Sequence, residues 1–481
     1  MRRIVIIGGG FSGSSAAVQL VRRSPAALDI TIVEPRTRVG GGLAYSTDEP
    51  EHRLNGQPGM HGLDPTDPGM FARWCDARDA CAADPAARVA NGTTFMRRSL
   101  FRTFLEETVI GHAAWPTGSS IRHVRDHAVD VVKRERTMVI MIAGGATLES
   151  EMVVLAPGHT RARLPAPFTA DHAAHPRVIV DPLAAPRLPA VPADDRVLVL
   201  GSGLTAYDIV STLQAAGHRG TIDVVSRRGL RPRPQRPPPA PGQPPPPPML
   251  ERTAAMPEAF ILDTGDAPTI RSLLRALRGR IAAAAAAGES WDGPFDHLRD
   301  MAGQVWPTLS VAEKKRFFRQ LRPWYDVHRF RVAPQNATLV LHAERGGQVR
   351  FRAAGVARVE SGDGHAPIRI GLRARGGPHV HEATFDRVIN CTGVDATAPG
   401  SVPLFAALLR RGLACIDPSG VGLAVDAHCR MLGADGQAAA RLRLVGPPTL
   451  GARGDPLGSA FIAIRIHHMT PDVLDALGVS G

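Results

Sequence analysis

The side chains best suited to acid–base chemistry gather in one short segment of the sequence. Asp326, His328 and Arg331 stand close together there, among aromatic residues. A carboxylate and an imidazole can move protons, and a guanidinium can hold an anionic group through two parallel hydrogen bonds. We therefore take these three residues as candidate catalytic residues at the edge of an active site. A second interpretation stays open, in which the arginines and the aspartate form a network that only joins a helix to a sheet.

A cofactor needs elements that position it, and the first of these stands at the start of the chain. Residues 4–7 are apolar, residues 8–13 are rich in glycine, and a helix is predicted over 14–21. A second apolar run, residues 30–33, ends in Glu34. Strand, glycine turn, helix, strand and acid in this order are typical of a nucleotide-binding βαβ unit.

The special residues of this unit each have a physical reason. Gly8 permits the tight turn, Gly10 lets the backbone approach a pyrophosphate, and Gly13 lets the helix pack closely on the strand. The helix N-terminus offers amide donors and the positive end of its dipole to the phosphates. Glu34 is placed to accept hydrogen bonds from the hydroxyls of a ribose. We predict a dinucleotide site here.

The same pattern returns in the middle of the chain. Residues 196–200 predict a strand, residues 201–206 a glycine turn, residues 207–216 a helix and residues 221–225 a second strand. Alanine replaces the third glycine, which the pattern tolerates. After the second strand, residues 226–228 read Ser-Arg-Arg in place of an acid. The chain therefore carries two dinucleotide-binding units.

The two units differ at the end of their second strand, and this difference indicates different cofactors. A carboxylate such as Glu34 suits an unphosphorylated ribose and would repel a 2′-phosphate, whereas Arg227 and Arg228 can bind that phosphate bidentately. The first unit therefore suits an unphosphorylated ribose, as in FAD, and the second suits NADPH. The alternative is that the two arginines only reflect an arginine-rich composition.

The composition points away from nucleic acid and membranes. The net charge is +12, but only three of the 57 basic residues are lysines, and aromatic residues make up only 5% of the chain. This arginine use is typical of a coding bias, and no basic stripe alternates with aromatic residues, so we expect no nucleic-acid partner. No apolar run reaches the length of about 18–20 residues that a membrane span needs. The apolar start is too short for a signal peptide and breaks into glycines, so we expect a cytoplasmic protein.

We expect neither a disulfide framework nor a metal site. The five cysteines and eighteen histidines are scattered, without the spacing that disulfide-rich or zinc-binding chains show. No cysteine pair lies in the first helical region, where a thiol–disulfide reductase with these domains would need one. The cysteines are Cys75, Cys81, Cys391, Cys415 and Cys429.

Several shorter motifs, taken together with the glycine turns, resemble one family. A GGGxSG start is followed by G-L-A-Y-S, by a turn ending in L-N, and by helices with D-P-x-x-F-x-x-W and R-x-x-F-x-x-F. These motifs stand at 8–13, 42–46, 52–55, 67–74 and 98–104. On these residues the chain resembles the bacterial FAD/NAD(P)-binding proteins of the two-dinucleotide-domain flavoprotein class, relatives of flavin monooxygenases and N-hydroxylases. The segment 322–334 is similar to the family's W-D-V-H-R-H-R-x-A-P segment, with Phe330 where a histidine is frequent.

The resemblance implies FAD on the first domain, with Asn55 and Arg98 near the flavin or its phosphates. It also implies that strands ending at 156–158 and 391–393 mark the crossings between domains, and that a last strand ends at Gly446 beside the flavin. The family's tail after that glycine, an acid and a P-E-I-R helix start, is largely replaced here. The expected cofactor-binding residues are Gly8, Gly10, Phe11, Ser12, Gly13, Glu34, Pro35, Arg36, Gly42, Leu43, Ala44, Tyr45, Leu54, Asn55, Arg98, Ala156, Pro157, Gly158, Gly201, Ser202, Gly203, Leu204, Thr205, Ala206, Ser226, Arg227, Arg228, Thr392, Gly393 and Gly446.

The fold class that follows is α/β, with two Rossmann-like dinucleotide-binding domains, the NADPH domain being inserted in the FAD domain. We expect the FAD domain in residues 1–165 and 380–481. We expect the NADPH domain in residues 190–375, with a helical insertion at about 232–334.

The segments between these units have their own signals. Residues 165–192 are rich in proline and alanine and predict a linker. The proline run at 237–248 predicts an extended surface connection or, alternatively, a docking site for a partner. Apolar spacing predicts a helix over 270–287, and Ser310 with Glu313 predicts a capping box that opens another helix.

Together these features predict hydride transfer from NADPH to FAD, with the reduced flavin then reacting with oxygen through a C4a-hydroperoxyflavin. The resemblance implies a monooxygenase for a small polar, nitrogen-containing substrate: an amino acid, an amine or a purine such as urate. The Baeyer–Villiger motif F-x-G-x-x-x-H-x-x-x-W is absent before the second glycine turn. Two alternatives stay open: a flavoprotein reductase that inserts no oxygen, and a non-catalytic dinucleotide sensor or scaffold.

Overall fold

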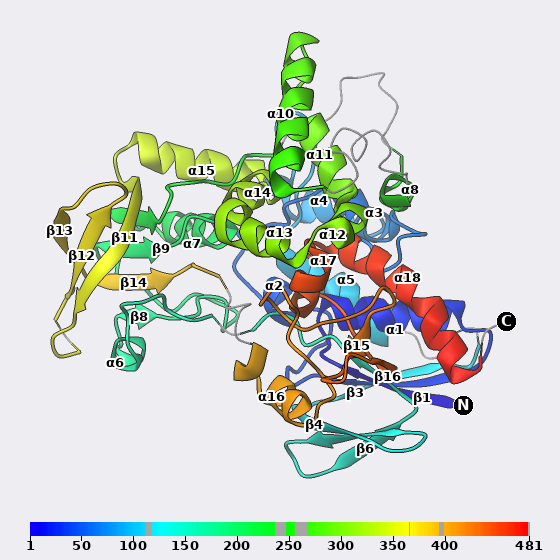
Figure 1. Cartoon of the computed structure of the whole chain (residues 1–481). Helices are drawn as coiled ribbons and strands as arrows, with labels where there is room; N and C mark the ends of the chain where they lie inside the picture. The colour runs from blue at the N-terminus through cyan, green and yellow to red at the C-terminus, as the bar shows by residue number, and fades with distance from the viewer. Residues whose placement is uncertain are drawn as a thin grey trace.

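The computed structural model describes residues 1–111, 115, 117–160, 162–235, 247–254, 268–364, 366–393 and 399–479. Figure 1 shows two lobes, each built on its own sheet, and a group of helices, of which α12 to α14 lie between the lobes and α10 and α11 project above them. The two mainly parallel sheets, each opening with a strand–turn–helix–strand unit, confirm the predicted α/β fold class.

The first lobe is built on a six-stranded sheet in the order β15-β16-β7-β1-β2-β3. All strands except the edge strand β15 run parallel. They are β1 (Arg2–Ile7), β2 (Leu28–Val33), β3 (Ser120–Val124), β7 (Met152–Leu155), β15 (Arg430–Leu432) and β16 (Ala438–Leu444). Helices α1 (Phe11–Arg23), α5 (Arg98–Ile110) and α18 (Ser459–Leu477) share one buried core with this sheet. The central strands are buried on both faces, which explains their continuous apolar sequences.

The second lobe is built on a seven-stranded sheet in the order β13-β12-β11-β10-β9-β14-β8. Its strands are β8 (Val178–Ile179), β9 (Val197–Leu200), β10 (Ile222–Ser226), β11 (Val349–Glu360), β12 (Ile368–Ala374), β13 (Val380–Phe385) and β14 (Arg387–Asn390). The strands from β11 to β8 in this order run parallel, and β12 and β13 extend the sheet antiparallel. Helices α7 (Leu204–Ala215) and α15 (Pro334–Arg345) pack on one face.

Smaller elements complete the first lobe. An antiparallel sheet joins β4 (Ala128–Lys133), β5 (Met138–Ile142) and β6 (Thr147–Ser150). The shorter helices are α2 (Gly42–Tyr45), α3 (Met70–Asp76), α4 (Ala80–Ala83), α16 (Pro403–Arg410) and α17 (Leu450–Arg453). The next strand, β7, leaves this small sheet and lies in the six-stranded sheet between β1 and β16.

Two expectations about the crossings differ from the structure. The expected linker at 165–192 contains α6 (Ala170–Ala174) and β8, which pairs with β14. β13 and β14 belong to the second sheet, whereas we expected the first domain to return at residue 380. A strand of only two residues carries little periodicity, so its long-range pairing could not be predicted from the sequence.

The helical insertion consists of α8 (Met249–Ala254), α10 (Ile270–Ala286), α11 (Asp292–Asp300), α12 (Ala302–Thr308), α13 (Val311–Arg316), a π-helical turn (Phe317–Leu321) and α14 (Arg322–Arg329). The predicted helix over 270–287 is confirmed. Ser310 caps α13 by accepting from Glu313 N, but the expected reciprocal bond is replaced: Glu313 Oε2 accepts from Ile270 N at 2.8 Å. Of the proline run, residues 237–246 lie outside the described residues.

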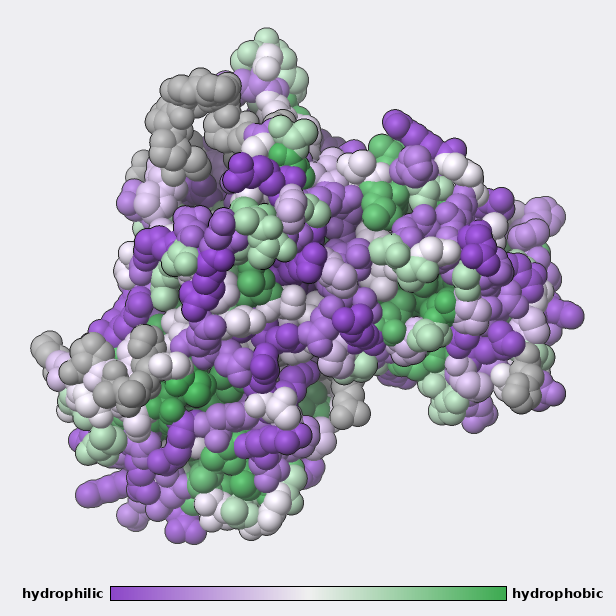
Figure 2. All heavy atoms as spheres, turned by 180° about the vertical axis from the view of Figure 1, so that it is seen from behind, coloured by the Kyte–Doolittle hydropathy of each residue, from purple (hydrophilic) through white to green (hydrophobic). Residues whose placement is uncertain are grey.

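The surface carries charged and apolar side chains in mixture. Figure 2 shows hydrophilic side chains spread over the whole of one face, with small hydrophobic patches between them. Within the described ranges, no helix combines the length and the apolar character needed to cross a bilayer.

Candidate functional site

The first glycine turn is shaped by close backbone contacts. Gly8 has φ +104°, and a Cβ atom there would lie 2.2 Å from the carbonyl oxygen of Ala156. A Cβ on Gly13 would lie 1.9 Å from the carbonyl oxygen of Gly8. Only glycine fits either position, because the neighbouring backbone fills the space and, at Gly8, L-residues also disfavour the φ. At this turn the backbones of β1, α1 and the end of β7 are therefore in close contact.

The second glycine turn repeats this arrangement. Gly201 has φ +95°, and its Cβ would lie 2.4 Å from the carbonyl oxygen of Cys391 at the end of β14. The segments Ala156-Pro157-Gly158 and Cys391-Thr392-Gly393 thus occupy equivalent places beside the two turns. Gly158 and Gly393 both have positive φ, and a Cβ on either would meet none of the described atoms within 4 Å.

Replacing Gly8 by alanine is expected to destabilise the protein by about 1–3 kcal/mol, as overpacking a well-packed site does. The control is Gly279→Ala in α10, where φ is ordinary and nothing lies within 4 Å of the added Cβ. There the same change is expected to raise the free energy of unfolding by about 0.5–1 kcal/mol. Chemical denaturation of the two variants measures both; equal stability of Gly8→Ala and the unsubstituted protein would contradict the packing argument.

The helices that follow the glycine turns leave their first amides without side-chain acceptors. The N-caps of α1 and α7 are Gly10 and Gly203, neither helix has a side-chain cap, and neither has an acid in its first turn. A Cβ on Gly203 would meet nothing within 4 Å, so the space in front of α7 is open. Phosphate oxygens are suitable acceptors for such amides. The first turns, Phe11-Ser12-Gly13 and Leu204-Thr205-Ala206, therefore fit the pyrophosphates of two dinucleotides.

Glu34 lies where the first ribose is expected. Its side chain is buried, Oε2 accepts from Gly9 N at 2.8 Å, and Oε1 accepts from the backbone N and Nη1 of Arg36, both at 3.1 Å. A carboxylate has about four acceptor positions, so it can still accept from hydroxyls. The Glu34-Pro35-Arg36 corner is thereby fixed against the glycine turn.

Arg227 and Arg228 follow β10 at the corresponding place of the second unit. Ser202 Oγ lies 2.8 Å from Ser226 Oγ and 2.6 Å from the carbonyl oxygen of Leu230, which fixes the corner that carries the arginines. Within the described part of the chain, neither guanidinium forms an ion pair, and Arg227 is exposed. Both cations are therefore available to an anionic ligand.

The loop at 40–46 closes over the first glycine turn. A Cβ on Gly10 would lie 3.2 Å from Gly42 Cα, so the two backbones approach closely. Leu43, Ala44 and Tyr45 form the rest of α2, and the Tyr45 ring packs edge-on against Phe101 at 4.9 Å. Burial raises the pKa of Tyr45 to about 12, so its hydroxyl stays protonated.

The last strand also reaches this turn. Gly446 follows β16 with φ +84°, and a Cβ there would lie 2.7 Å from Ser12 Oγ. The structure therefore brings the end of β16 to the first turn of α1, where the sequence placed it.

Arg98 and Asn55 make contacts between the lobes. Arg98 Nη2 donates to Asp208 of α7 at 2.6 Å, and Arg98 Nε donates to Arg53 O at 3.1 Å. The carbonyl oxygen of Asn55, beside the buried Leu54, accepts from Gln235. The charge of Arg98 is matched by the buried carboxylate of Asp208 in the second lobe, and its place near the flavin or its phosphates stays a prediction.

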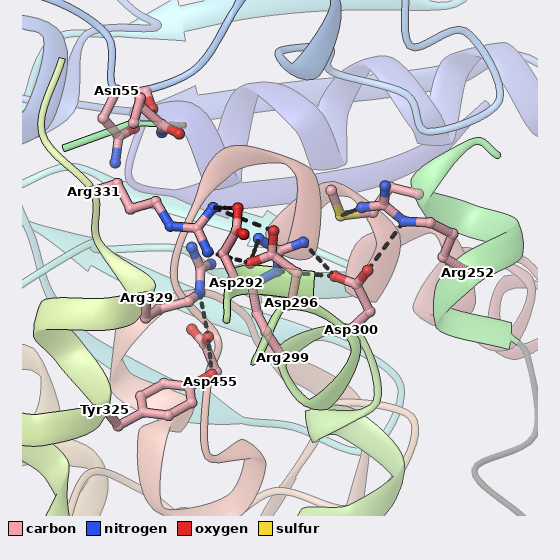
Figure 3. Close-up of polar contacts among 12 residues, drawn as sticks. Asn55, Arg252, Asp292, Asp296, Arg299, Asp300, Tyr325, Arg329, Arg331 and Asp455 are labelled. Carbon is pink, nitrogen blue, oxygen red and sulfur yellow. Dashed lines mark hydrogen bonds and ion pairs between the residues drawn. The ribbon is translucent and has the colours of Figure 1, made fainter. Parts of the chain in front are cut away.

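The three candidate catalytic residues do not converge, and Arg331 lies in an ion-pair network. It donates to both oxygens of Asp296, at 2.7 and 3.2 Å, and lies 3.9 Å from Asp292 (Figure 3). Arg299 extends the network to Asp300 at 2.8 Å. Since the Arg331 side chain is only 6% exposed, the second interpretation, a network that joins elements together, is favoured for it.

His328 and Asp326 stand two residues apart on α14 and therefore point to different faces of the helix. His328 Nδ1 donates to the carbonyl oxygen of Trp324 at 2.7 Å. Its ring lies 5.1 Å from Trp291 and 5.5 Å from Phe295, in an aromatic group of the insertion.

Asp326 pairs with Arg322 on α14, and Arg322 lies near the first crossing between the lobes. Burial raises the pKa of its carboxyl, against the opposing charge of Arg322, whose Nε donates to it at 3.2 Å. Loss of hydration and the charge of the same Arg322 lower the pKa of His159 to about 4. His159 directly follows Gly158, so Arg322 and Asp326 lie near the crossing loop that adjoins the first glycine turn.

Asp455 ties α14 to the first lobe and was not singled out in the sequence. Its Oδ2 accepts from Tyr325 Oη at 2.8 Å and from Arg329 Nε at 2.6 Å, and Arg329 also donates to Leu457 O at 2.9 Å (Figure 3). Burial raises the pKa of Tyr325 well above its usual value. The family's tail carries an acid after its glycine, and that was the signal that could have led to Asp455.

His61 predicts a measurable pH dependence of stability. It is buried, its Nδ1 lies 2.8 Å from Ser459 Oγ at the start of α18, and burial lowers its pKa to about 4. Between about pH 6.5 and 4 the unfolded ring binds a proton that the native ring does not, so the free energy of unfolding falls as pH falls. His61→Gln should remove up to about 3 kcal/mol of this loss.

Urea unfolding at several pH values between about 7 and 4 measures the effect, with His381→Gln on the exposed side of β13 as control. If the free energy of unfolding depends on pH in the same way in the unsubstituted protein and in His61→Gln, buried His61 is not the cause of the loss of stability.

Two buried thiols of the chain are unreactive, and no metal-binding group is found among the described residues. The described residues contain no group of three or more His, Cys, Asp or Glu side chains that could hold a metal ion. Burial raises the pKa of the Cys75 thiol to about 12 and that of Cys391 further. Since the thiolate is the nucleophile, both stay unreactive at neutral pH.

Comparisons with known proteins agree with this geometry. A family model described as FAD-NAD(P)-binding matches residues 5–160. No curated protein matches the chain. The ornithine N-hydroxylase of Kutzneria sp. 744, in a form with reduced FAD, NADP+ and L-ornithine, is similar in structure, with a TM-score of 0.64 at 15% identity, over 99% of this chain and 98% of that one.

Two further structures show the breadth of the fold. The L-lysine 6-monooxygenase of Pseudomonas syringae has a TM-score of 0.59 at 14% identity, over 99% of this chain and 100% of that one. The thioredoxin reductase of Lactococcus lactis has a TM-score of 0.52 at 11% identity, over 99% of both chains. The chain thus has the two-lobed fold of flavoproteins with two dinucleotide-binding domains, and its first lobe carries the FAD-NAD(P)-binding domain.

Proposed function

We propose that the chain is an FAD- and NADPH-dependent monooxygenase that acts on a nitrogen-containing organic substrate. The observation that carries the proposal is the asymmetry between the two units: buried Glu34 follows β2, and Arg227 and Arg228 follow β10. An acid suits the ribose of FAD, and guanidinium groups suit the 2′-phosphate of NADPH. FAD is assigned to the lobe formed by residues 1–165 and the returning C-terminal part, and NADPH to the lobe between them.

Oxygen insertion is favoured over thiol chemistry. The fold is shared by oxygen-inserting enzymes, among them the ornithine and lysine hydroxylases, and by a thioredoxin reductase. A disulfide reductase needs a reactive thiol, but Cys75 and Cys391 are buried with raised pKa values. The acceptor of the electrons is then oxygen together with a small organic molecule. Free cysteines also suit a cytoplasmic location.

The chemistry balances as a four-electron reduction of oxygen, with two electrons from NADPH and two from the substrate. An N–H group, oxygen, NADPH and a proton give an N–OH group, NADP+ and water. FAD, when bound, carries the electrons from NADPH to oxygen. The protein's part is to hold both dinucleotides at the glycine turns and to keep water from the reaction space. Asp326, with its raised pKa beside the crossing loop, is the candidate for moving the proton.

The test is made on purified protein. A yellow protein that oxidises NADPH with oxygen uptake, stimulated by an amine and yielding a hydroxylated product, supports the proposal. Bound FAD and NADPH oxidation without an oxygenated product for any of a panel of amino acids, amines and purines would favour a reductase. A colourless protein that does not take up FAD would overturn the proposal.

A further inference from the structure

The helical insertion, together with Gly454 and Asp455 of the first lobe, lines a mainly apolar pocket that the sequence did not indicate. Its volume is about 640 Å³, and side chains of α10, α11, α12 and α14 form its walls. Ligand pockets commonly have about 300–1,000 Å³ and mainly hydrophobic walls with few polar groups. The pocket therefore has the size and the lining of a site for an organic molecule.

The pocket lies inside the core of the insertion. Leu273, Leu277, Phe295 and Trp306 line it, and their exposed fractions are only 5–8%. Protein cores are close-packed, with few voids larger than a water molecule. A space of this volume between core side chains is therefore a feature that a ligand can fill.

The polar residues that line the pocket are Arg233, Arg278, Tyr325, His328 and Asp455, and among them His328 can offer a neutral acceptor. His328 Nδ1 donates to Trp324 O, so in the neutral ring Nε2 is an acceptor. His328 lines the pocket, and its Nε2 forms no hydrogen bond with the residues that the structure describes. Asp455 also lines the pocket, but Tyr325 and Arg329 already share its carboxylate. The imidazole at the pocket wall thus has a free acceptor, which suits a ligand with an uncharged N–H or O–H donor.

The pocket adjoins the segment that leads to the first cofactor site. Asp455 stands just before Ser459, which begins α18. Ser459 Oγ lies 2.8 Å from His61 Nδ1, and the His61 ring packs against Phe101, which contacts Tyr45 near the first glycine turn. A molecule in the pocket is therefore held on the side of the insertion that faces the flavin-binding lobe.

We propose that this pocket holds the body of the substrate, and that the substrate is an aromatic molecule with an N–H group bonded to His328 Nε2, rather than a small amino acid. This assignment rests on the proposed monooxygenase function. Among the nitrogen-containing substrates expected from the sequence it favours one with an apolar body, because most of the side chains that line the pocket are apolar.

The test uses the purified full-length protein and two probes, indole and indene. The two have similar shapes, and only indole carries an N–H donor. Titration calorimetry is expected to show saturable binding of both, with indole about 2–10-fold tighter, as one hydrogen bond provides. His328→Phe should bind the two probes equally, since it keeps the ring and removes the acceptor.

A second variant tests the pocket without removing a polar group. Leu274 lines the pocket on α10 and is half-buried, so Leu274→Trp should fill part of the space and weaken the binding of both probes about tenfold or more. Leu341→Trp on α15, where Leu341 is 43% exposed and outside the pocket, should leave binding unchanged. No saturable binding of indole, or equal affinity in Leu274→Trp, would overturn the assignment.

Two further measurements separate this inference from the function. If another amine stimulates oxygen uptake and indole binds without doing so, the substrate assignment fails and the monooxygenase stands. If indole binds in a pocket-dependent way to a protein that takes up no FAD, the pocket is a binding site but the substrate assignment and the function fail together.

Discussion

Replacing both Arg227 and Arg228 by alanine is expected to raise the KM for NADPH about 100-fold or more and to leave the KM for NADH nearly unchanged. Each charge-assisted hydrogen bond to the 2′-phosphate contributes about 1.5–3 kcal/mol, and NADH has no such phosphate. Neither arginine forms an ion pair among the described residues. The double variant should therefore fold as the unsubstituted protein does.

Steady-state kinetics with both nucleotides makes this measurement. Arg219→Ala is the matched control, because Arg219 is an exposed arginine of the same lobe whose guanidinium is paired with Asp194 at 2.7 Å. It should change neither KM. If the KM values for NADPH and NADH rise equally in the double variant, the arginines do not hold the phosphate.

The parts of the fold that were predictable are those set by local backbone requirements. Gly8 and Gly201 need positive φ and leave no room for a Cβ, and such demands are visible as glycine at fixed spacing. The helices they open, α1 and α7, begin three residues earlier than predicted, because the N-caps are the glycines themselves. Local chemistry thus sufficed to locate both dinucleotide units.

The partners of charged side chains were not predictable in the same way. Arg331 pairs with Asp296, and Arg329 pairs with Asp455, far away in the sequence. In a chain with so many arginines, the residue type alone does not distinguish a ligand-binding guanidinium from a structural one. Arg98 illustrates this, since nothing in the sequence indicated that its guanidinium bonds Asp208 of the second lobe.

The apolar pocket shows a third kind of limit. The spacing of Leu273, Leu277 and Ile281 correctly predicted a helix with one apolar face. Periodicity tells which face turns inward but not how closely the facing helices approach. Whether that face meets a packed core or a cavity depends on the whole set of side chains, which only the tertiary structure gives.

The contact between Arg98 and Asp208 carries the largest expected effect on stability. It joins α5 of the first lobe to α7 of the second, and the two side chains are only 14% and 6% exposed. Asp208→Ala should lower the free energy of unfolding by about 3–5 kcal/mol, because it leaves a guanidinium buried without its partner.

Two comparisons determine what such a loss means. Asp194→Ala breaks an exposed pair in the second lobe, with side chains 75% and 67% exposed, and should change stability little. Arg98→Met combined with Asp208→Leu removes both charges, and it should recover most of the stability lost in Asp208→Ala, since apolar replacement of a buried pair is often neutral. Urea unfolding of all variants is the measurement.

If Asp208→Ala unfolds at the same urea concentration as the unsubstituted protein, the pair does not hold the lobes together. If the double variant is as unstable as Asp208→Ala, the shape of the pair matters and its charge does not. Recovery in the double variant, with NADPH oxidation retained, would show that the pair serves to join the lobes and that neither group is needed for the chemistry.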